Sequence, residues 1–149
     1  MTGTTIAPSG LSSTLATVRR ISLRLVNVSA WLVFAMAWGQ IATAGYGLFA
    51  IESMPMTEAS SLDAHRTLGY ATEFVGVGMM VFLLVAWPRW SVTWPAVTLF
   101  AVMLVQPVLQ RLGDTAPILG AMHAANALVT IALAFLVARR AQRALSCRD

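Results

Sequence analysis

The sequence predicts an all-α protein, an integral membrane four-helix transmembrane bundle with both termini in the cytoplasm. Of its 149 residues, 58% are hydrophobic and 11% are charged, whereas about a quarter of the residues of a soluble domain are charged. Four apolar segments stand out, each near the ~20 residues that a helix needs to cross ~30 Å of hydrocarbon. They are roughly Leu25 to Ile51, His65 to Trp87, Val92 to Leu112 and Ile118 to Val137.

The placement of the charged residues predicts the orientation. All ten basic residues are arginines, and eight of them lie before the first segment, between the second and third, or after the fourth. Four acidic residues lie in the other two loops, namely Glu52, Glu58, Asp63 and Asp114. Arginine-rich loops stay in the cytoplasm by the positive-inside rule. Both termini are therefore expected in the cytoplasm, and the net charge of +4 reflects this topology and gives no reason to propose nucleic acid. We expect a multi-pass protein of the bacterial inner (plasma) membrane, with the lipid bilayer as partner.

The first segment is expected to be a retained helix. Residues 1–18, rich in Thr, Ser and Gly, show no sustained period and predict a flexible cytoplasmic leader. Three arginines then precede the apolar run, as in a signal peptide, but the run far exceeds the roughly 7 to 15 residues of a signal h-region. We expect residues 19–140 to form the transmembrane domain and residues 141–149, with the single cysteine Cys147, to form a cytoplasmic tail.

Proline and glycine delimit the other three segments. "PRWS" at residues 88–91 and "GDTAP" at residues 113–117 predict tight turns, so the last three segments are expected to be antiparallel neighbours. The longest connection runs from about Glu52 to Ala64. Trp87, Trp90 and Trp94 around the first turn fit an aromatic belt at the headgroups. Pro107 predicts a kink toward the outer end of the third segment.

Polar residues are confined to the outer half of this predicted bundle. His65 and His123, the only two histidines, each stand at the outer start of a segment, and Glu73 follows His65 by about 12 Å along a helix. The remaining members of the set are Arg66, Gln106, Gln110, Arg111 and Asn126. Ionisable groups inside a membrane usually face the bundle interior or mark a functional path. The outer half is therefore the candidate site.

Helical spacing puts small residues on the same face as each histidine. Gly69, Thr72 and Gly76 share a face with His65, while Asn126, Ala127 and Thr130 share one with His123. Such stripes either let helices approach closely or leave a slot for a flat ligand. Two imidazoles at equal depth suit axial ligation of a haem iron, and arginines suit the haem propionates. The predicted binding residues for haem b are His65 and His123 as iron ligands, with Arg66, Arg111, Gly69, Glu73 and Asn126 around them.

Simpler roles for the same side chains stay open. His65 can cap a helix at the membrane interface, and His123 can bond Asn126 or the "GDTAP" turn. Glu73 is either a proton relay or counter-ion, or structural glue paired with Arg66 or Gln106. If these side chains have only such structural roles, the protein is a cofactor-free accessory or interaction protein.

Methionines indicate a further alternative. Met54, Met56 and Met122, together with the two histidines, put soft ligands suited to Cu(I) near the outer face. A small metal-handling or permeation protein is therefore the other alternative function. No phosphate-binding loop, HExxH or nucleophile-elbow pattern occurs, so soluble-enzyme chemistry is not expected.

Three short motifs resemble one four-helix half of the haem A synthase family. They are "DAHRTLGY" at residues 63–70, "QPVLQRLGD" at 106–114 and "MHAANALV" at 122–129, and the similarity covers about Val26 to Arg140. The chain also resembles a family of small four-helix bacterial membrane proteins that share the His-Arg and His-x-x-Asn signatures. Both resemblances rest on the order and helix positions of the motifs. The first implies that His65 and His123 are axial haem ligands.

The chain departs from the synthases in three ways. Leu62 stands where they usually have an acidic residue, with Asp63 one place later, and the cysteine pair of their first outer loop is absent. The chain also supplies one half instead of two, which leaves a homodimer open. The resemblance therefore implies haem binding, with electron transfer to or from quinol or an exported redox protein. It does not imply an enzyme in its own right that oxidises a haem methyl group.

Overall fold

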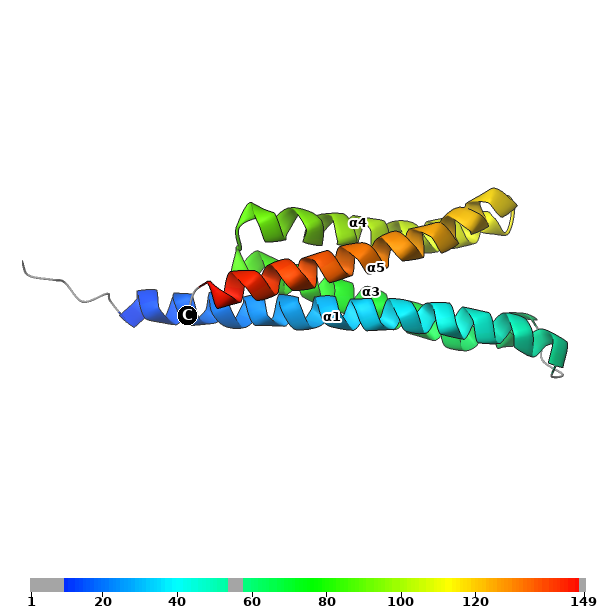
Figure 1. Cartoon of the computed structure of the whole chain (residues 1–149), viewed down its shortest axis with the longest axis horizontal. Coiled ribbons are helices and arrows are strands. Elements are labelled where there is room, and N and C mark those ends of the chain that lie inside the picture. Colours follow the sequence, from blue (N-terminus) through cyan, green and yellow to red (C-terminus); the bar gives the residue numbers. More distant parts are fainter. Residues whose placement is uncertain (1–9, 54–57, 148–149) are drawn as a thin grey trace, which may run out of the picture.

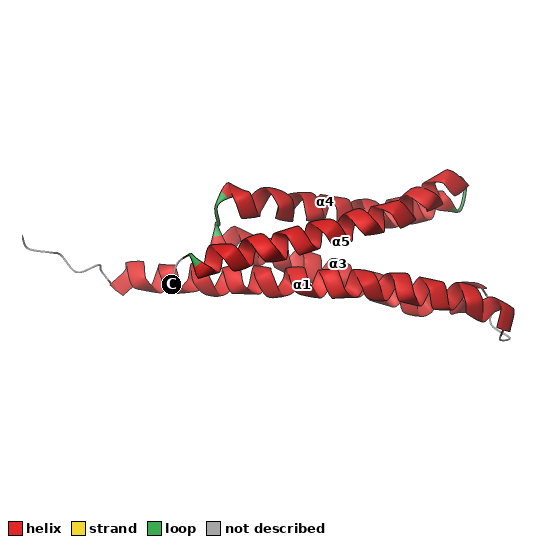
Figure 2. Cartoon of the chain, viewed as in Figure 1, coloured by secondary structure: helices red, strands yellow, loops and turns green. Residues whose placement is uncertain are grey.

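The computed structural model describes residues 10–53 and 58–147, and the regular structure in those ranges is entirely helical. The elements are α1 (Gly10–Ser53), α2 (Glu58–Ser61), α3 (Asp63–Ala86), α4 (Trp90–Gly113) and α5 (Pro117–Ser146). All but α2 are long and apolar enough to cross a membrane. Figures 1 and 2 show these four as an antiparallel bundle in which α1 begins and α5 ends at the same end. The predicted all-helical, four-helix architecture is confirmed.

Two helices extend beyond the apolar segments that predict them. Residues 10–18, expected in a loose leader, are helical and continue without a break into the first apolar segment. No proline interrupts them, and Leu11, Leu15 and Val18 follow helical spacing. At about 1.5 Å per residue, the 44 residues of α1 extend about 66 Å, roughly twice the thickness of the hydrocarbon layer. Similarly, α5 continues through residues 141–146, which were expected in the tail.

The bundle consists of two helix pairs. The helix α1 packs along α3, and α4 packs along α5; α5 also packs on α1, while α3 and α4 meet to a smaller extent. Asn27 Nδ2 in α1 donates a hydrogen bond to the backbone oxygen of Ala138 in α5 at 2.7 Å, which joins the pairs. Toward the α4–α5 turn the pairs diverge (Figure 1). We call the end with the α3–α4 turn the arginine-rich end and the opposite end the histidine end.

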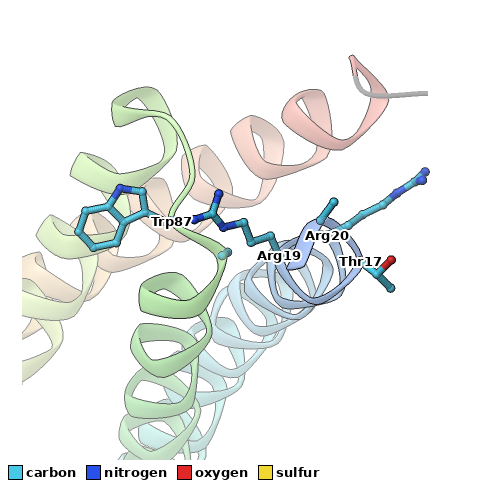
Figure 3. Close-up of a pocket in the computed structure, with 6 residues that line it drawn as sticks. Thr17, Arg19, Arg20 and Trp87 are labelled. Atoms are coloured by element: carbon cyan, nitrogen blue, oxygen red, sulfur yellow. The ribbon is translucent and has the colours of Figure 1, made fainter. Parts of the chain in front are cut away.

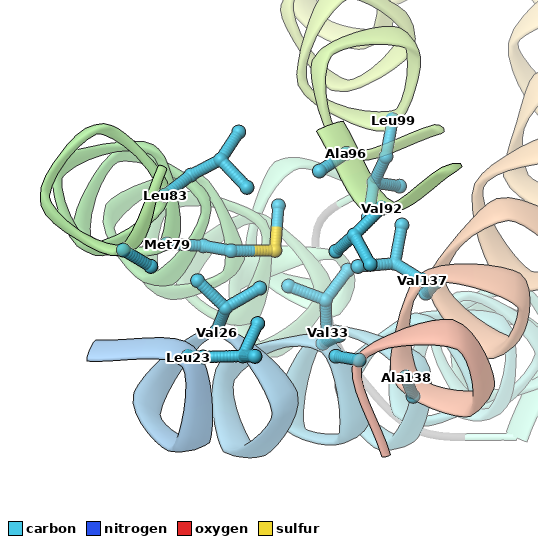
Figure 4. Packing of buried hydrophobic residues seen from close by; sticks show 14 of the residues in the cluster. Leu23, Val26, Val33, Met79, Leu83, Val92, Ala96, Leu99, Val137 and Ala138 are labelled. Carbon is cyan, nitrogen blue, oxygen red and sulfur yellow. The ribbon is translucent and has the colours of Figure 1, made fainter. Parts of the chain in front are cut away.

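The closely packed core lies toward the arginine-rich end. All four long helices contribute fully buried side chains that converge there (Figure 4). They include Val26 and Val33 of α1, Met79 of α3, Leu99 of α4 and Val137 of α5. Ala134 and Ala138 are also completely buried, and such small residues let helices approach closely where lipid offers no hydrophobic driving force between them. This core joins the two pairs toward the arginine-rich end.

A proline inside α4 frees a backbone carbonyl that α5 uses. Pro95 has no N–H, so the carbonyl of Ser91 lacks its usual donor four residues later. Arg140 Nη1 of α5 donates to that oxygen at 2.9 Å, and its guanidinium lies 5.0 Å from the centre of the Trp94 ring. Arg140 thus joins the start of α4 to the end of α5.

Replacing Arg140 with alanine is expected to lower the free energy of unfolding by about 1–2 kcal/mol, because a charge-assisted hydrogen bond and a cation–π contact are lost. Thermal denaturation in detergent, followed by circular dichroism, measures the change. Arg139→Ala is the matched control, since Arg139 is its exposed neighbour in α5. An equal loss of stability in both variants would contradict the role assigned to Arg140.

The last turn of α3 leads into a tryptophan with left-handed backbone. Trp87 has φ 41° and ψ 58°, and its N–H donates to the Leu83 oxygen at 3.0 Å. Glycine usually occupies this position of a helix end, because left-handed backbone costs other residues about 1–2 kcal/mol. The Trp87 side chain is 72% exposed, so burial within the protein does not offset this cost.

Candidate functional site

The two histidines meet between the helix pairs. His65 lies near the start of α3 and His123 near the start of α5, and their ring centroids are 6.2 Å apart with the planes at 76°. Each ring comes from the second helix of a different pair. The site therefore forms only when both helix pairs are in place.

Each imidazole is held by the first helix of its own pair. His65 Nδ1 lies 3.0 Å from the backbone oxygen of Gln40 in α1, and His123 Nδ1 lies 3.1 Å from that of Gln106 in α4. A carbonyl oxygen can only accept, so each Nδ1 carries the hydrogen. In the neutral ring this leaves the lone pair on Nε2, and a ligand histidine is typically oriented in this way by a bond from its other nitrogen. Both rings are thus in a form that can ligate a metal.

The distance between the rings suits one metal ion between two nitrogens. When two Nε2 atoms point at one ion from opposite sides, bonds of about 2 Å from each nitrogen to the metal, plus about 1 Å from each nitrogen to its ring centre, separate the ring centroids by about 6 Å. The observed separation is 6.2 Å. Within residues 10–53 and 58–147 no cluster of three or more His, Cys, Asp or Glu side chains could hold a metal. Haem needs only two ligands from the protein, because the macrocycle supplies the other four.

The stripe of small residues on α3 contacts its neighbours closely. Gln40 Nε2 donates to Thr72 Oγ1 at 3.4 Å, and a Cβ built on Gly69 would lie 3.5 Å from Gln40 Oε1. A Cβ on Gly76 would lie only 2.6 Å from Cε of Met103 in α4. Close helix packing therefore accounts for the small residue at Gly76, the end of the stripe farthest from His65. A slot for a flat ligand would have to lie between Met103 and the histidine end.

Asn126 joins α5 to α4 instead of bonding His123. Its Nδ2 donates to the Val102 oxygen at 3.0 Å, in the turn of α4 that precedes Pro107, where a proline loosens the helical hydrogen bonds. The alternative in which His123 bonds Asn126 or the "GDTAP" turn is wrong, because the Gln106 carbonyl is its partner. Asn126 thus fixes the α4–α5 pair that positions His123.

The charged residues of the predicted site have different surroundings. Arg66 Nη1 lies 3.4 Å from Asp63 Oδ1, with 40% of the Arg66 side chain exposed. Arg111 is exposed in the last turn of α4, also at the histidine end. Glu73 is half-buried, and within the described part of the chain no hydrogen bond or ion pair joins it to Arg66 or Gln106.

Interior-facing side chains are less buried here than in the core. His65, His123, Gln106 and Asn126 are all half-buried, and Gln110 is exposed. Gln106 Oε1 is itself buried without a hydrogen-bond partner in the described residues. At this end the helix pairs diverge (Figure 1), and the side chains between them are less buried than those of the core.

The methionine cluster of the copper alternative is only partly described. Met54 and Met56 lie outside the described residues. Met122, next to His123, is 50% exposed. The copper alternative therefore stays a prediction, because two of its three thioethers belong to residues outside the described ranges.

Sequence reasoning missed the two backbone carbonyls that orient the histidines. Gln40 and Gln106 were expected to act through their side chains, whereas their main-chain oxygens hold the imidazoles. Any residue type supplies such an oxygen, so the side-chain pattern carries no signal for it.

In comparisons with protein-family models, curated proteins and solved structures, nothing matches this chain. The site therefore has to be interpreted from its own geometry, and the resemblance to a half of the haem A synthase family stays a prediction.

Proposed function

We propose that this chain is a b-type haem-binding membrane protein with His65 and His123 as the two axial iron ligands. One observation carries the proposal: the two imidazoles lie 6.2 Å apart, and each is oriented by a bond from Nδ1 to a backbone carbonyl. Bound haem would supply one-electron chemistry. If His65 and His123 both held the iron of such a haem, no iron position would be left for a substrate, which favours electron transfer over an enzymatic activity.

Neighbouring residues support the same cofactor. Arg66 and Arg111 at the histidine end would pair with the haem propionates, since guanidinium groups match carboxylates. Glu73, half-buried and without a partner among the described residues, would balance charge or hold a proton when the iron changes its oxidation state. Gly69 and Asn126 act through the helices, Gly69 by admitting Gln40 and Asn126 by bonding α4.

The electron partner follows from the proposed placement in the membrane. Four membrane-length helices and the arginine distribution support a bacterial inner membrane protein whose arginine-rich end faces the cytoplasm. The histidine end then faces outward, within reach of quinol in the bilayer or of an exported redox protein. Gln106 Oε1 is a buried acceptor without a hydrogen-bond donor among the described residues, and a quinol hydroxyl could donate to it. A single chain suffices for both axial ligands, so a homodimer would be needed only for functions beyond haem binding.

Absorption spectra of the protein purified in detergent, oxidised and then reduced with dithionite, test this function. Expression with ample haem is expected to yield a Soret band and sharp α and β bands on reduction, as in a six-coordinate bis-histidine haem. A featureless spectrum from protein with native helix content would overturn the proposal. Copper retention in its place, lost on Met54 and Met56 substitution, would favour metal handling, and absence of both would favour an accessory protein.

A further inference from the structure

We propose that the arginine-rich end binds one anionic phospholipid, with its phosphate headgroup between α1 and the end of α3 and an acyl chain between α3 and α4. The inference rests on the membrane placement proposed above and is independent of haem. Two cavities that meet at Trp87 carry it. One is lined by arginines and the other by apolar side chains.

The headgroup site is a cavity of about 370 Å³ between α1 and the end of α3. Figure 3 shows the Arg19 side chain extending from α1 toward the Trp87 indole. The other lining residues are Ala16, Thr17, Arg20 and Ala86. The two alanines leave room between the helices, and arginine offers a planar set of donors that matches a phosphate.

The charge of this end calls for an anion from outside the described chain. Arg19 is exposed, and no carboxylate among residues 10–53 and 58–147 pairs with it. Every acidic residue of those ranges lies toward the histidine end or in the loops there, namely Glu52, Glu58, Asp63, Glu73 and Asp114. Basic pockets between helices on the cytoplasmic side of a membrane are suited to anionic headgroups.

The acyl-chain site is a mainly apolar groove, also about 370 Å³ in volume, between α3 and α4. Trp87 lines it at one end, and Met80 lies about 10 Å further along α3 toward the bundle centre. Leu84 of α3 and Val97 of α4 form part of its walls. The groove therefore runs from Trp87, which it shares with the headgroup site, toward the bundle centre, and this is the direction that an acyl chain would take in a bilayer.

Trp87 belongs to both sites, and this accounts for its backbone. Trp87 has a left-handed backbone conformation that glycine would adopt without strain. Its indole is not buried within the protein, so protein contacts do not offset this strain. An amphipathic ring at the boundary between headgroup and chain gains its contacts from lipid. Binding of lipid is thus the role that offsets the strain.

Native mass spectrometry of the detergent-purified protein tests the headgroup site, with phosphatidylglycerol and phosphatidylcholine of identical chains as probes. Arg19→Gln is expected to lower the ratio of phosphatidylglycerol to phosphatidylcholine adducts about fivefold. Arg139→Gln removes the same charge from an exposed position of α5 and is expected to leave the ratio nearly unchanged. Equal losses in the two variants would show a diffuse basic surface and overturn the site.

The chain site has its own matched pair. Val97→Trp fills the groove and is expected to reduce phosphatidylglycerol adducts severalfold, whereas Val105→Trp, at the same 45% exposure on α4 but outside the groove, is not. Trp87→Gly removes the strain of the left-handed backbone and is expected to leave the thermal stability equal to or above that of the wild type, while the preference for phosphatidylglycerol is lost. Inorganic phosphate in excess is not expected to displace the lipid. Displacement by phosphate, or equal effects of both valine substitutions, would overturn a phospholipid as the occupant.

Discussion

Replacing either histidine with alanine is expected to abolish the six-coordinate haem spectrum. His65→Ala and His123→Ala each remove one of the proposed iron ligands, and the backbone carbonyl of Gln40 or Gln106 loses the imidazole that contacts it. Changes in the groups that orient a ligand already cost 10–100-fold in metal affinity, so loss of the ligand itself should lower haem content at least about tenfold. Reduced-minus-oxidised spectra, normalised to protein, measure the effect.

The neighbouring positions supply controls for this loss. Met122→Ala changes a half-exposed side chain beside His123, and Thr67→Ala changes an exposed one near His65, without touching either ring contact. Both should keep the bands of the wild type. Added imidazole should restore the six-coordinate spectrum of the histidine variants, because it can occupy the space of the lost ring. Retention of the bands in either histidine variant, or their loss in Met122→Ala, would contradict bis-histidine ligation.

The number of long helices and the limits of α3 and α4 were predictable, because membrane thickness sets the length of an apolar segment and proline or glycine marks the turns. The long α1 was not, since its first turns are not apolar enough to stand out, while nothing in residues 10–24 stops a helix that has begun. Hydropathy thus detects the most apolar part of a helix and misses a more polar continuation of the same helix.

The sequence predicted where the site residues lie along the helices, but not which of them contact one another across the bundle. Antiparallel connections place His65 and His123 near the same end, but only the packing of α5 on α1 decides that the two rings face each other. Glu73 illustrates the same limit. Its spacing from Arg66 suggested an ion pair along α3, whereas Arg66 lies against Asp63. Helical periodicity gives the face of a residue and leaves its partner on that face undetermined.

The position of His65 also depends on close contact between α1 and the chain that leads into α3. Gly47 of α1 is buried, and a Cβ there would lie 2.5 Å from the backbone oxygen and 3.1 Å from the carbonyl carbon of Ser61. Ser61 precedes His65 by about one helical turn. Gly47→Ala must therefore displace backbone, and we expect it to destabilise the protein by about 1–3 kcal/mol, despite the gain in helix propensity of up to about 1 kcal/mol.

Gly45→Ala is the matched control, because a Cβ at Gly45 meets nothing within 4 Å. The same helix gains the same methyl group two residues away, so this variant should be as stable as the wild type or more stable by up to about 1 kcal/mol. Thermal denaturation compares the two, and haem content measures whether displacement of Ser61 reaches the bond between His65 and Gln40. We expect Gly47→Ala to lose both stability and haem. Equal stability of the two variants would mean that α1 does not approach Ser61 this closely, and loss of stability without loss of haem would mean that His65 is held by Gln40 alone.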